Sequence, residues 1–262
     1  MVYADQPRNQ FAPSVAHYRR KHATIRKDDP LQRFLARHVT YAIWDDHEIE
    51  DGANGEHPRI ADALQVYKEY WPCEPAAADG LYRRFAWAGA DFFMLDTRRF
   101  RSPQTMTDGA GKTMLGAAQK QWFFETLQAS TAPFKFIITS VPFHGASSDA
   151  WGTYRTERDE IVRFIRENKV RGIVFLTGDY HLARDWTNAG TRLREYMAGP
   201  IAQSPMYKRS PENRERYQKA GTFHYGDGNS FGFVRVDPAA ERATVELVGA
   251  DGKTMFSADL TP

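Results

Sequence analysis

Cysteine is almost absent from this chain of 262 residues, and its scarcity excludes two common ways of stabilising a fold. The single Cys73 cannot form a disulfide within the chain, and no Cys/His pattern has the spacing of a structural zinc site. Long apolar runs are missing too, because no stretch approaches the ~20 apolar residues that span a bilayer. Residues 1–7 lack the basic and apolar regions of a signal peptide. We therefore expect a soluble chain without a visible export signal.

A strong excess of charge is also missing, because 35 basic residues are balanced by 33 acidic ones. The resulting net charge of +2 gives no reason to expect a specific nucleic-acid partner. The hydrophobic share of 42% is typical of an ordinary globular protein. A chain of this length can bury one sizeable core, and we find no internal repeat. One domain, residues 1–262, is the simplest expectation.

Apolar runs alternate with amphipathic segments along the chain, which predicts an α/β fold. Helices are expected at residues 11–38 (two, broken near 29–30), 60–70, 119–130 and 157–168. Strands are expected at residues 39–44, 81–87, 90–95, 134–140 and 172–178. Beyond residue 186 the pattern weakens to a strand pair at 186–197, a polar segment at 200–228 and a closing hairpin at about 231–248.

Two clusters of acidic residues and histidine carry the chemical information in this sequence. Asp45, Asp46 and His47 form the first, Asp179 and His181 form the second, and each follows a predicted strand. Open α/β sheets bind ligands at the carboxyl ends of their strands, so we expect the two clusters to converge. Carboxylate oxygens and imidazole nitrogens are suitable ligands for divalent and trivalent metals. A surface turn that caps a helix is the alternative for one cluster alone.

A further histidine, His144, lies just past a predicted strand and a proline turn, where it would face the same sheet edge. A loop histidine held by hydrogen bonds is an equal alternative for this residue, and the sequence leaves both open. The histidines His17, His22, His38 and His57 lie in polar helical or loop contexts. We predict that these four are surface residues.

Four motifs, in order, resemble the PhoD-like alkaline phosphatases and phosphodiesterases, which belong to the calcineurin-like metallophosphatases. They are Trp-Asp-Asp-His-Glu at 44–48, Leu-Asp-Thr-Arg-Arg-Phe-Arg-Ser at 95–102, Met-Leu-Gly-Ala-Ala-Gln-Lys-Gln-Trp at 114–122 and Gly-Asp-Tyr-His at 178–181. The resemblance implies a four-layer αββα sandwich that hydrolyses small phosphate esters by metal-activated hydroxide. It implies two metal ions, iron and calcium, with zinc or manganese as alternatives. A metal ion lowers the pKa of its bound water toward ~7, which suits this chemistry.

The same resemblance assigns roles to the residues of the two clusters. Asp46 stands at the position of a metal ligand, and His47 at that of the acid that protonates the leaving group, so both are candidate catalytic residues. Asp179 and His181 match the ligand pair of the Gly-Asp-x-His motif. Asp45 matches a further ligand, or a carboxylate that supports one.

Arg98 and Arg99 are candidate substrate-binding residues, together with His144. A guanidinium fork fits two phosphate oxygens, which is the physical reason to nominate the arginines. Solvated arginines at a sheet edge are the alternative, and the sequence leaves this open. It decides neither the preference for monoesters or diesters nor the oligomeric state.

The front of the chain departs from the resemblance. Residues 1–5 match the end of a Gly-Asp-x-x-Tyr motif, with Tyr3 at the position of a tyrosine that binds iron. The aspartate of that motif, which would bridge both metals, would lie before residue 1, so an N-terminally truncated sandwich is expected. Cys73 lies too far along the sequence to replace the cysteine ligand of the family's first strand, and a loop thiol is expected there.

Three functions stay open at this point. The first is metal-dependent phosphate-ester hydrolysis, and the second is a catalytically impaired remnant that binds phosphate or a single metal without turnover. A nuclease that uses the same carboxylates is the third, and the near-neutral charge argues against it. Members of the family are often exported to the periplasm or out of the cell, but no signal in this sequence indicates a compartment.

Overall fold

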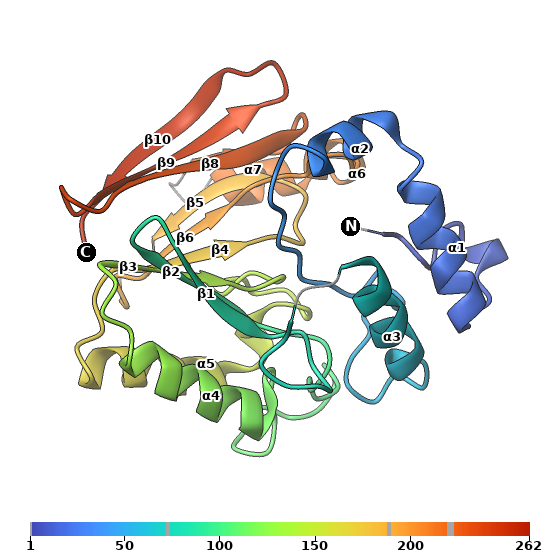
Figure 1. Cartoon of the computed structure of the whole chain (residues 1–262), viewed down its shortest axis with the longest axis horizontal. Coiled ribbons are helices and arrows are strands. Elements are labelled where there is room, and N and C mark those ends of the chain that lie inside the picture. The colour runs from blue at the N-terminus through green and yellow to red at the C-terminus, as the bar shows by residue number, and fades with distance from the viewer. Residues whose placement is uncertain (1, 72–73, 188–189, 219–222) are drawn as a thin grey trace.

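Two β-sheets and a set of surrounding helices make up the computed structural model, which describes residues 2–71, 74–187, 190–218 and 223–262 (Figure 1). The larger sheet has seven strands in the order β1-β2-β3-β4-β6-β5-β7. Their bounds are β1 Arg83–Trp87, β2 Ala90–Met94, β3 Phe134–Ile138, β4 Ile173–Thr177, β5 Ala183–Thr187, β6 Arg194–Met197 and β7 His224–Tyr225. Neighbouring strands among β2, β3, β4 and β6 run parallel, and antiparallel strands flank them on both sides.

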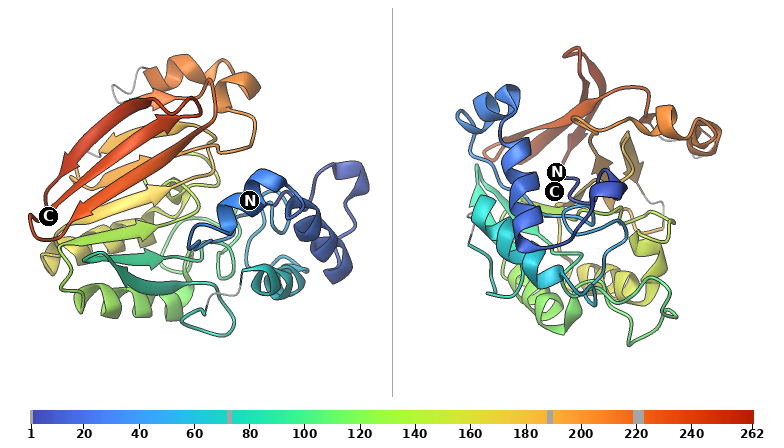
Figure 2. Two further views of the ribbon diagram at one scale, coloured as in Figure 1. Left: turned by 45° about the horizontal axis from the view of Figure 1, so that its top comes forward. Right: turned by 90° about the vertical axis from the view of Figure 1, so that its right-hand side faces the viewer.

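The smaller sheet packs on one face of the larger sheet, and helices cover the other (Figures 1 and 2). Its three strands, in the order β10-β9-β8, are β8 Ser230–Asp237, β9 Arg242–Gly249 and β10 Thr254–Leu260. The covering helices are α4 Gly116–Gln128 and α5 Arg155–Glu167. A separate group near the N-terminus contains α1 Val15–Ile25, α2 Asp29–Leu35 and α3 Ile60–Tyr70. Shorter elements are η1 Arg8–Gln10, η2 Trp151–Thr153, α6 Met206–Arg209 and α7 Asn213–Gln218.

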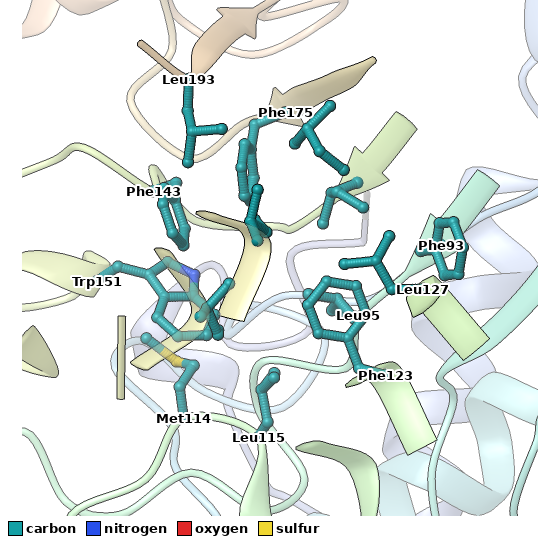
Figure 3. Packing of buried hydrophobic residues seen from close by; sticks show 14 of the residues in the cluster. Phe93, Leu95, Met114, Leu115, Phe123, Leu127, Phe143, Trp151, Phe175 and Leu193 are labelled. Atoms are coloured by element: carbon teal, nitrogen blue, oxygen red, sulfur yellow. The ribbon is translucent and has the colours of Figure 1, made fainter. Parts of the chain in front are cut away.

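Apolar side chains fill the space on both faces of the larger sheet. Between the sheet and the helices, Phe93, Phe123 and Phe175 are at most 1% exposed (Figure 3). Between the two sheets, Phe136 packs with Val245 and their neighbours. Each such side chain contributes roughly 1.5–3 kcal/mol by leaving water, so both layers hold the strands and their polar ends in place.

The predicted α/β fold is confirmed, because strands and helices alternate through the part of the chain that carries the larger sheet. The expected hairpin near 231–248 is extended by β10, which the sequence analysis missed. No helix in the described ranges is long and apolar enough to cross a bilayer. Cys73, expected to be a loop thiol, lies outside the described residues.

The predicted strand at residues 39–44 is wrong, since the structure shows irregular extended chain there. Val39 is 82% exposed and Tyr41 is 45% exposed, although the ring of Tyr41 stacks on Phe85 with centroids 3.9 Å apart. An apolar run becomes a strand only when a neighbour accepts its backbone hydrogen bonds. No described strand pairs with this segment, although it still leads directly into the first acidic cluster.

The surface prediction is also wrong for two of the four histidines. His17 and His22 are each 2% exposed. Nε2 of His17 hydrogen bonds to the carbonyl oxygen of Ala4 at 2.7 Å, and the ring of His22 stacks on Tyr70 of α3 with centroids 4.8 Å apart. The polar composition of α1 concealed the face that packs against α3 and the N-terminal segment.

Candidate functional site

Tyr3 joins the two predicted clusters. Its ring stacks on His47 with centroids 4.1 Å apart, and its hydroxyl lies 2.9 Å from Nε2 of His181. The convergence expected from strand ends is therefore present, although one cluster follows an irregular segment rather than a strand. The first residues of the chain contribute to the site, because Tyr3 lies between two histidines that are 134 positions apart in the sequence.

Backbone hydrogen bonds fix the N-terminal residues against the first cluster. The amides of Val2 and Asp45 both donate to the carboxylate of Glu48, at 2.6 and 2.8 Å, and the amide of Ala4 donates to the carbonyl of His47. Glu48 is 4% exposed, so its charge is compensated by these buried donors. This arrangement positions the Tyr3 ring over His47.

Asp46 and His47 are each held by their own partners. The Asp46 carboxylate accepts hydrogen bonds from the amides of His47 and Gly52, at 2.8 and 2.9 Å. Nδ1 of His47 lies 2.9 Å from the carboxylate of Asp5. Burial lowers the pKa of His47, but the hydrogen bond to Asp5 and the charges of Asp46 and Asp5 outweigh it, so the pKa is raised overall.

Asp45 belongs to a buried charge network with Arg98 and Asp149. Arg98 Nε donates to Asp45 Oδ1 at 2.7 Å, and its two terminal nitrogens donate to Asp149. Ser140 also donates to Asp45 Oδ1 at 2.7 Å, whereas Oδ2 of Asp45 has no hydrogen-bond partner among the described residues. Burial raises the pKa of Asp45 to about 6 even though Arg98 lowers it.

Asp179 and His181 occupy a strained turn directly after β4. Their φ angles of 75° and 54° lie in the left-handed region, which residues other than glycine rarely adopt. Backbone strain of this kind is concentrated at functional sites, where the surrounding structure maintains it. Burial raises the pKa of Asp179 well above its ordinary value, and the charge of Asp45 raises it further.

The buried carboxylates of the site carry more negative charge than the protein compensates. Asp45 and Asp46 are 2% and 6% exposed, and the negative charges of both add to the raised pKa of Asp179. Uncompensated buried charge is costly, and a bound cation would remove that cost. With the unpartnered Asp45 Oδ2 and two nearby imidazoles, this donor set fits a metal ion of the oxygen- and nitrogen-binding class.

A second group of possible metal ligands shares Asp46 and His47 with the first acidic cluster. Ligand atoms of Asp46, His47 and Asp51 all lie within 4.8 Å of one another. The side chain of Asp51 is 52% exposed and is already paired with Arg8 at 2.6 Å. The sequence analysis did not nominate Asp51, because no spacing rule connects it with the motif around Asp45. Its exposure and its existing partner make it the weaker ligand candidate.

The predicted substrate-binding residues lie in three different environments. Arg98 is fully buried, and its donors are engaged by Asp45, Asp149 and the carbonyl of Ala53, which favours a role as counter-ion over phosphate binding. Arg99 donates to the carbonyl of Asp79 at 3.0 Å. Protein groups thus occupy Arg98, and the role of Arg99 in substrate binding stays a prediction.

His144 is held by Glu195, a residue that the sequence analysis did not identify. Nδ1 of His144 lies 2.9 Å from Glu195 Oε2, and the hydroxyl of Thr177 donates to the other oxygen at 2.8 Å. Nε2 of His144 is buried without a hydrogen-bond partner in the described chain. The role of His144 in substrate binding stays a prediction. Glu195 lies within β6, where no motif marks a functional residue.

Comparison with known sequences identifies relatives over most of the chain. The profile of the family described as PhoD-like phosphatase matches residues 1–247. A curated relative, alkaline phosphatase D of Bacillus subtilis (strain 168), is 31% identical over 205 residues. That alignment covers 64% of this chain and 35% of the relative, so the chain spans about a third of the relative's length.

Two solved structures resemble this chain to different extents. A structure described as that of PhoD superposes with a TM-score of 0.75 at 24% identity, covering 96% of this chain and 57% of the solved chain. A purple acid phosphatase isolated from yellow lupin (Lupinus luteus) seeds superposes with a TM-score of 0.48 at 12% identity, covering 76% and 36% of the two chains. The first similarity establishes that the arrangement of sheets described above is that of a known fold.

Proposed function

Because this chain belongs to the PhoD-like phosphatase family, we propose that it hydrolyses phosphate esters at the site formed by its two acidic-histidine clusters. The proposed reaction is that of a phosphodiesterase or alkaline phosphatase acting on small phosphate esters. The family match includes every residue of the candidate site, from Tyr3 to His181. The name of the curated relative, alkaline phosphatase D, supports the same reaction class.

The observation that carries this proposal is the excess of buried carboxylates around Tyr3 and His181. Burial and the negative charges of Asp45 and Asp46 raise the pKa of Asp179, and Asp45 Oδ2 has no partner among the described residues. A site built only for stability would be expected to pair these groups. A site built to hold cations beside a phosphoryl group needs a carboxylate oxygen such as Asp45 Oδ2 to stay without a protein partner.

Two metal ions are proposed for this site, iron and calcium, with zinc or manganese as alternatives. Tyr3, Asp45, Asp46, Asp179 and His181 would hold them, because these residues supply oxygen and nitrogen donors around one buried region. When bound, such ions lower the pKa of water and neutralise the charge that develops on the phosphoryl oxygens.

His47 is proposed to protonate the leaving oxygen of the ester. Its side chain is 17% exposed, which lets it reach both the buried carboxylates and an incoming substrate. The Asp5 carboxylate accepts a hydrogen bond from Nδ1–H and so favours the charged imidazolium that a general acid requires. The Asp46 carboxylate accepts a hydrogen bond from the backbone amide of His47. This bond helps to fix the position of the imidazole relative to the proposed ligands.

Hydrolysis of bis-p-nitrophenyl phosphate and of p-nitrophenyl phosphate tests the proposal. We expect turnover of at least one ester by the metal-loaded chain, and loss of that turnover after treatment with a chelator. Binding of inorganic phosphate without hydrolysis of either ester would contradict the proposal and support the impaired remnant. Turnover that survives complete removal of metal would contradict the assignment of the carboxylates.

A further inference from the structure

Helix α6, a single turn ending in Arg209, is connected to the candidate site by hydrogen bonds to His181. The amide of Met206 donates to the carbonyl of His181 at 2.8 Å, and Nδ1 of His181 lies 3.0 Å from the carbonyl of Ser204. The amide of Tyr207 donates to the carbonyl of Gly226 at 2.9 Å. These bonds hold α6 against the turn that carries His181, so its last residue has a defined place beside the site.

The Arg209 guanidinium contacts this site directly. Its Nη1 lies 3.0 Å from Nδ1 of His181. The other ring nitrogen of His181, Nε2, lies 2.9 Å from the hydroxyl of Tyr3, so the guanidinium lies against a ring that belongs to the site. Arg209 is exposed and pairs with no carboxylate in the described part of the chain.

Two of the other arginines near the carboxylates are committed to protein groups. Arg98 and Arg101 are at most 1% exposed, and both bind Asp149. Arg99 donates to the carbonyl of Asp79. Arginine has five N–H donors in a planar fork, and Arg209 uses one of them. Within the described residues, Arg209 is therefore the arginine that contacts the site and keeps most of its donors free.

The contact between Arg209 and His181 depends on the position of one proton. Nδ1 of His181 cannot accept from Arg209 while it donates to the carbonyl of Ser204, because a ring nitrogen does one or the other. When Nε2 accepts a hydrogen bond from Tyr3 or serves as a ligand, the ring proton is on Nδ1 and bonds to Ser204. The guanidinium then loses its acceptor and needs another one.

We propose that Arg209 is a phosphate-binding residue of this site, and that its guanidinium holds two non-bridging oxygens of the substrate phosphoryl group and of inorganic phosphate. The inference rests on the proposed function and adds a residue that no sequence motif marked. An arginine fork matches two phosphate oxygens in geometry and charge. In this role Arg209 takes the place that the sequence analysis gave to Arg98 and Arg99.

The test compares the variants Arg209→Gln and Arg209→Lys with the matched control Lys208→Gln. Lys208 is an exposed cation on the same helical turn, and its charge acts on Asp227. Three quantities are measured on the metal-loaded protein: KM and kcat for bis-p-nitrophenyl phosphate, and the Kd of inorganic phosphate by titration calorimetry. The exposed position of Arg209 lets all three variants fold, which circular dichroism verifies.

We expect Arg209→Gln to raise both KM and the phosphate Kd by about 10- to 100-fold, the range for losing hydrogen bonds to a charged group. Arg209→Lys should recover part of the loss, and Lys208→Gln should stay within about twofold of the wild-type values. An Arg209→Gln variant that binds phosphate as tightly as the wild type would overturn the inference. A wild-type chain that binds phosphate through Arg209 without turnover would contradict the proposed function alone, and one that binds no phosphate would overturn both.

Discussion

The guanidinium of Arg98 binds the carboxylate of Asp45 at 2.7 Å, and the two side chains are 0% and 2% exposed. One positive charge is thus buried beside the first acidic cluster, where it also compensates Asp149. Arg98 therefore compensates part of the negative charge of the carboxylates at the site. Asp45 uses one oxygen for Arg98 and Ser140, and its other oxygen has no hydrogen-bond partner among the described residues.

Replacing Arg98 by methionine is expected to destabilise the protein strongly. The change leaves Asp45 and Asp149 buried without their shared cation, and breaking such a pair costs about 3–5 kcal/mol. The free energy of unfolding, measured in urea, should fall by that order. Arg99→Met is the matched control, because Arg99 is only partly buried and contacts a carbonyl, and its effect should stay below about 1 kcal/mol. Equal stability of the two variants would argue against the buried network.

Replacing His181 by alanine should remove metal, whereas Asp51→Asn should not. His181 contacts Tyr3, another proposed metal ligand, at 2.9 Å. Asp51 is half-exposed and paired with Arg8. Metal per chain, measured by plasma mass spectrometry after dialysis, should fall markedly in the first variant and match the wild type in the second. The reverse pattern would place the metal at Asp46, His47 and Asp51 instead.

Replacing Tyr3 by phenylalanine should selectively reduce the iron content. Burial raises the pKa of Tyr3, so its hydroxyl stays protonated near neutral pH unless a cation favours the phenolate. Phenylalanine keeps the stacking on His47 but offers no oxygen ligand. Loss of one hydrogen bond should cost the metal-free protein only about 1 kcal/mol. Iron per chain equal to that of the wild type, measured beside calcium, would contradict the assigned role of Tyr3.

Stability should fall with pH through the titration of His22. Burial and the charge of Arg26 lower the pKa of His22 to about 4, against ~6.5 in an unfolded chain. The unfolded state therefore binds more protons in this range, so the stabilisation is complete above pH ~6.5 and is lost as the pH falls toward 4. We expect a loss of about 1–3 kcal/mol after allowance for solvent screening.

The variants His22→Gln and His38→Gln test this pH dependence in urea unfolding at several pH values. The His22 variant should show a flatter decline between pH 6.5 and 4 than the wild type. The His38 variant should follow the wild type, because His38 is exposed. If the two variants decline in parallel, the buried environment of His22 does not control the acid response.

The sequence could predict the elements whose own side chains determine their structure. Helix α3 was expected at 60–70 and is observed there, because its apolar side chains repeat at helical spacing and pack on the N-terminal group. The strand predicted at 39–44 was wrong because its structure depends on residues outside the segment. Its apolar pattern is that of a strand, but a strand also needs a neighbour, and no property of the segment itself reveals whether one is present.

The residues of the candidate site also fall into those visible in the sequence and those that depend on distant contacts. The acidic-histidine clusters were visible as motifs, and Tyr3 was visible because it matched a known pattern. Glu195 and Arg209 were not, because each becomes relevant only through a contact with a histidine far away in the sequence. Arg98 was nominated for phosphate binding, with a solvated arginine as the alternative, because sequence shows a charge but not the two carboxylates that already bind it.

The central claim is that the buried carboxylates hold metal ions that support phosphate-ester hydrolysis. The most direct measurement determines metal content by plasma mass spectrometry together with bis-p-nitrophenyl phosphate turnover, for the wild type and for Asp46→Ala. We predict about two metal ions per chain and measurable turnover in the wild type. In the Asp46→Ala variant, bound metal and turnover should both be lost. A wild-type chain without bound metal, or an Asp46→Ala variant with undiminished turnover, would contradict the claim.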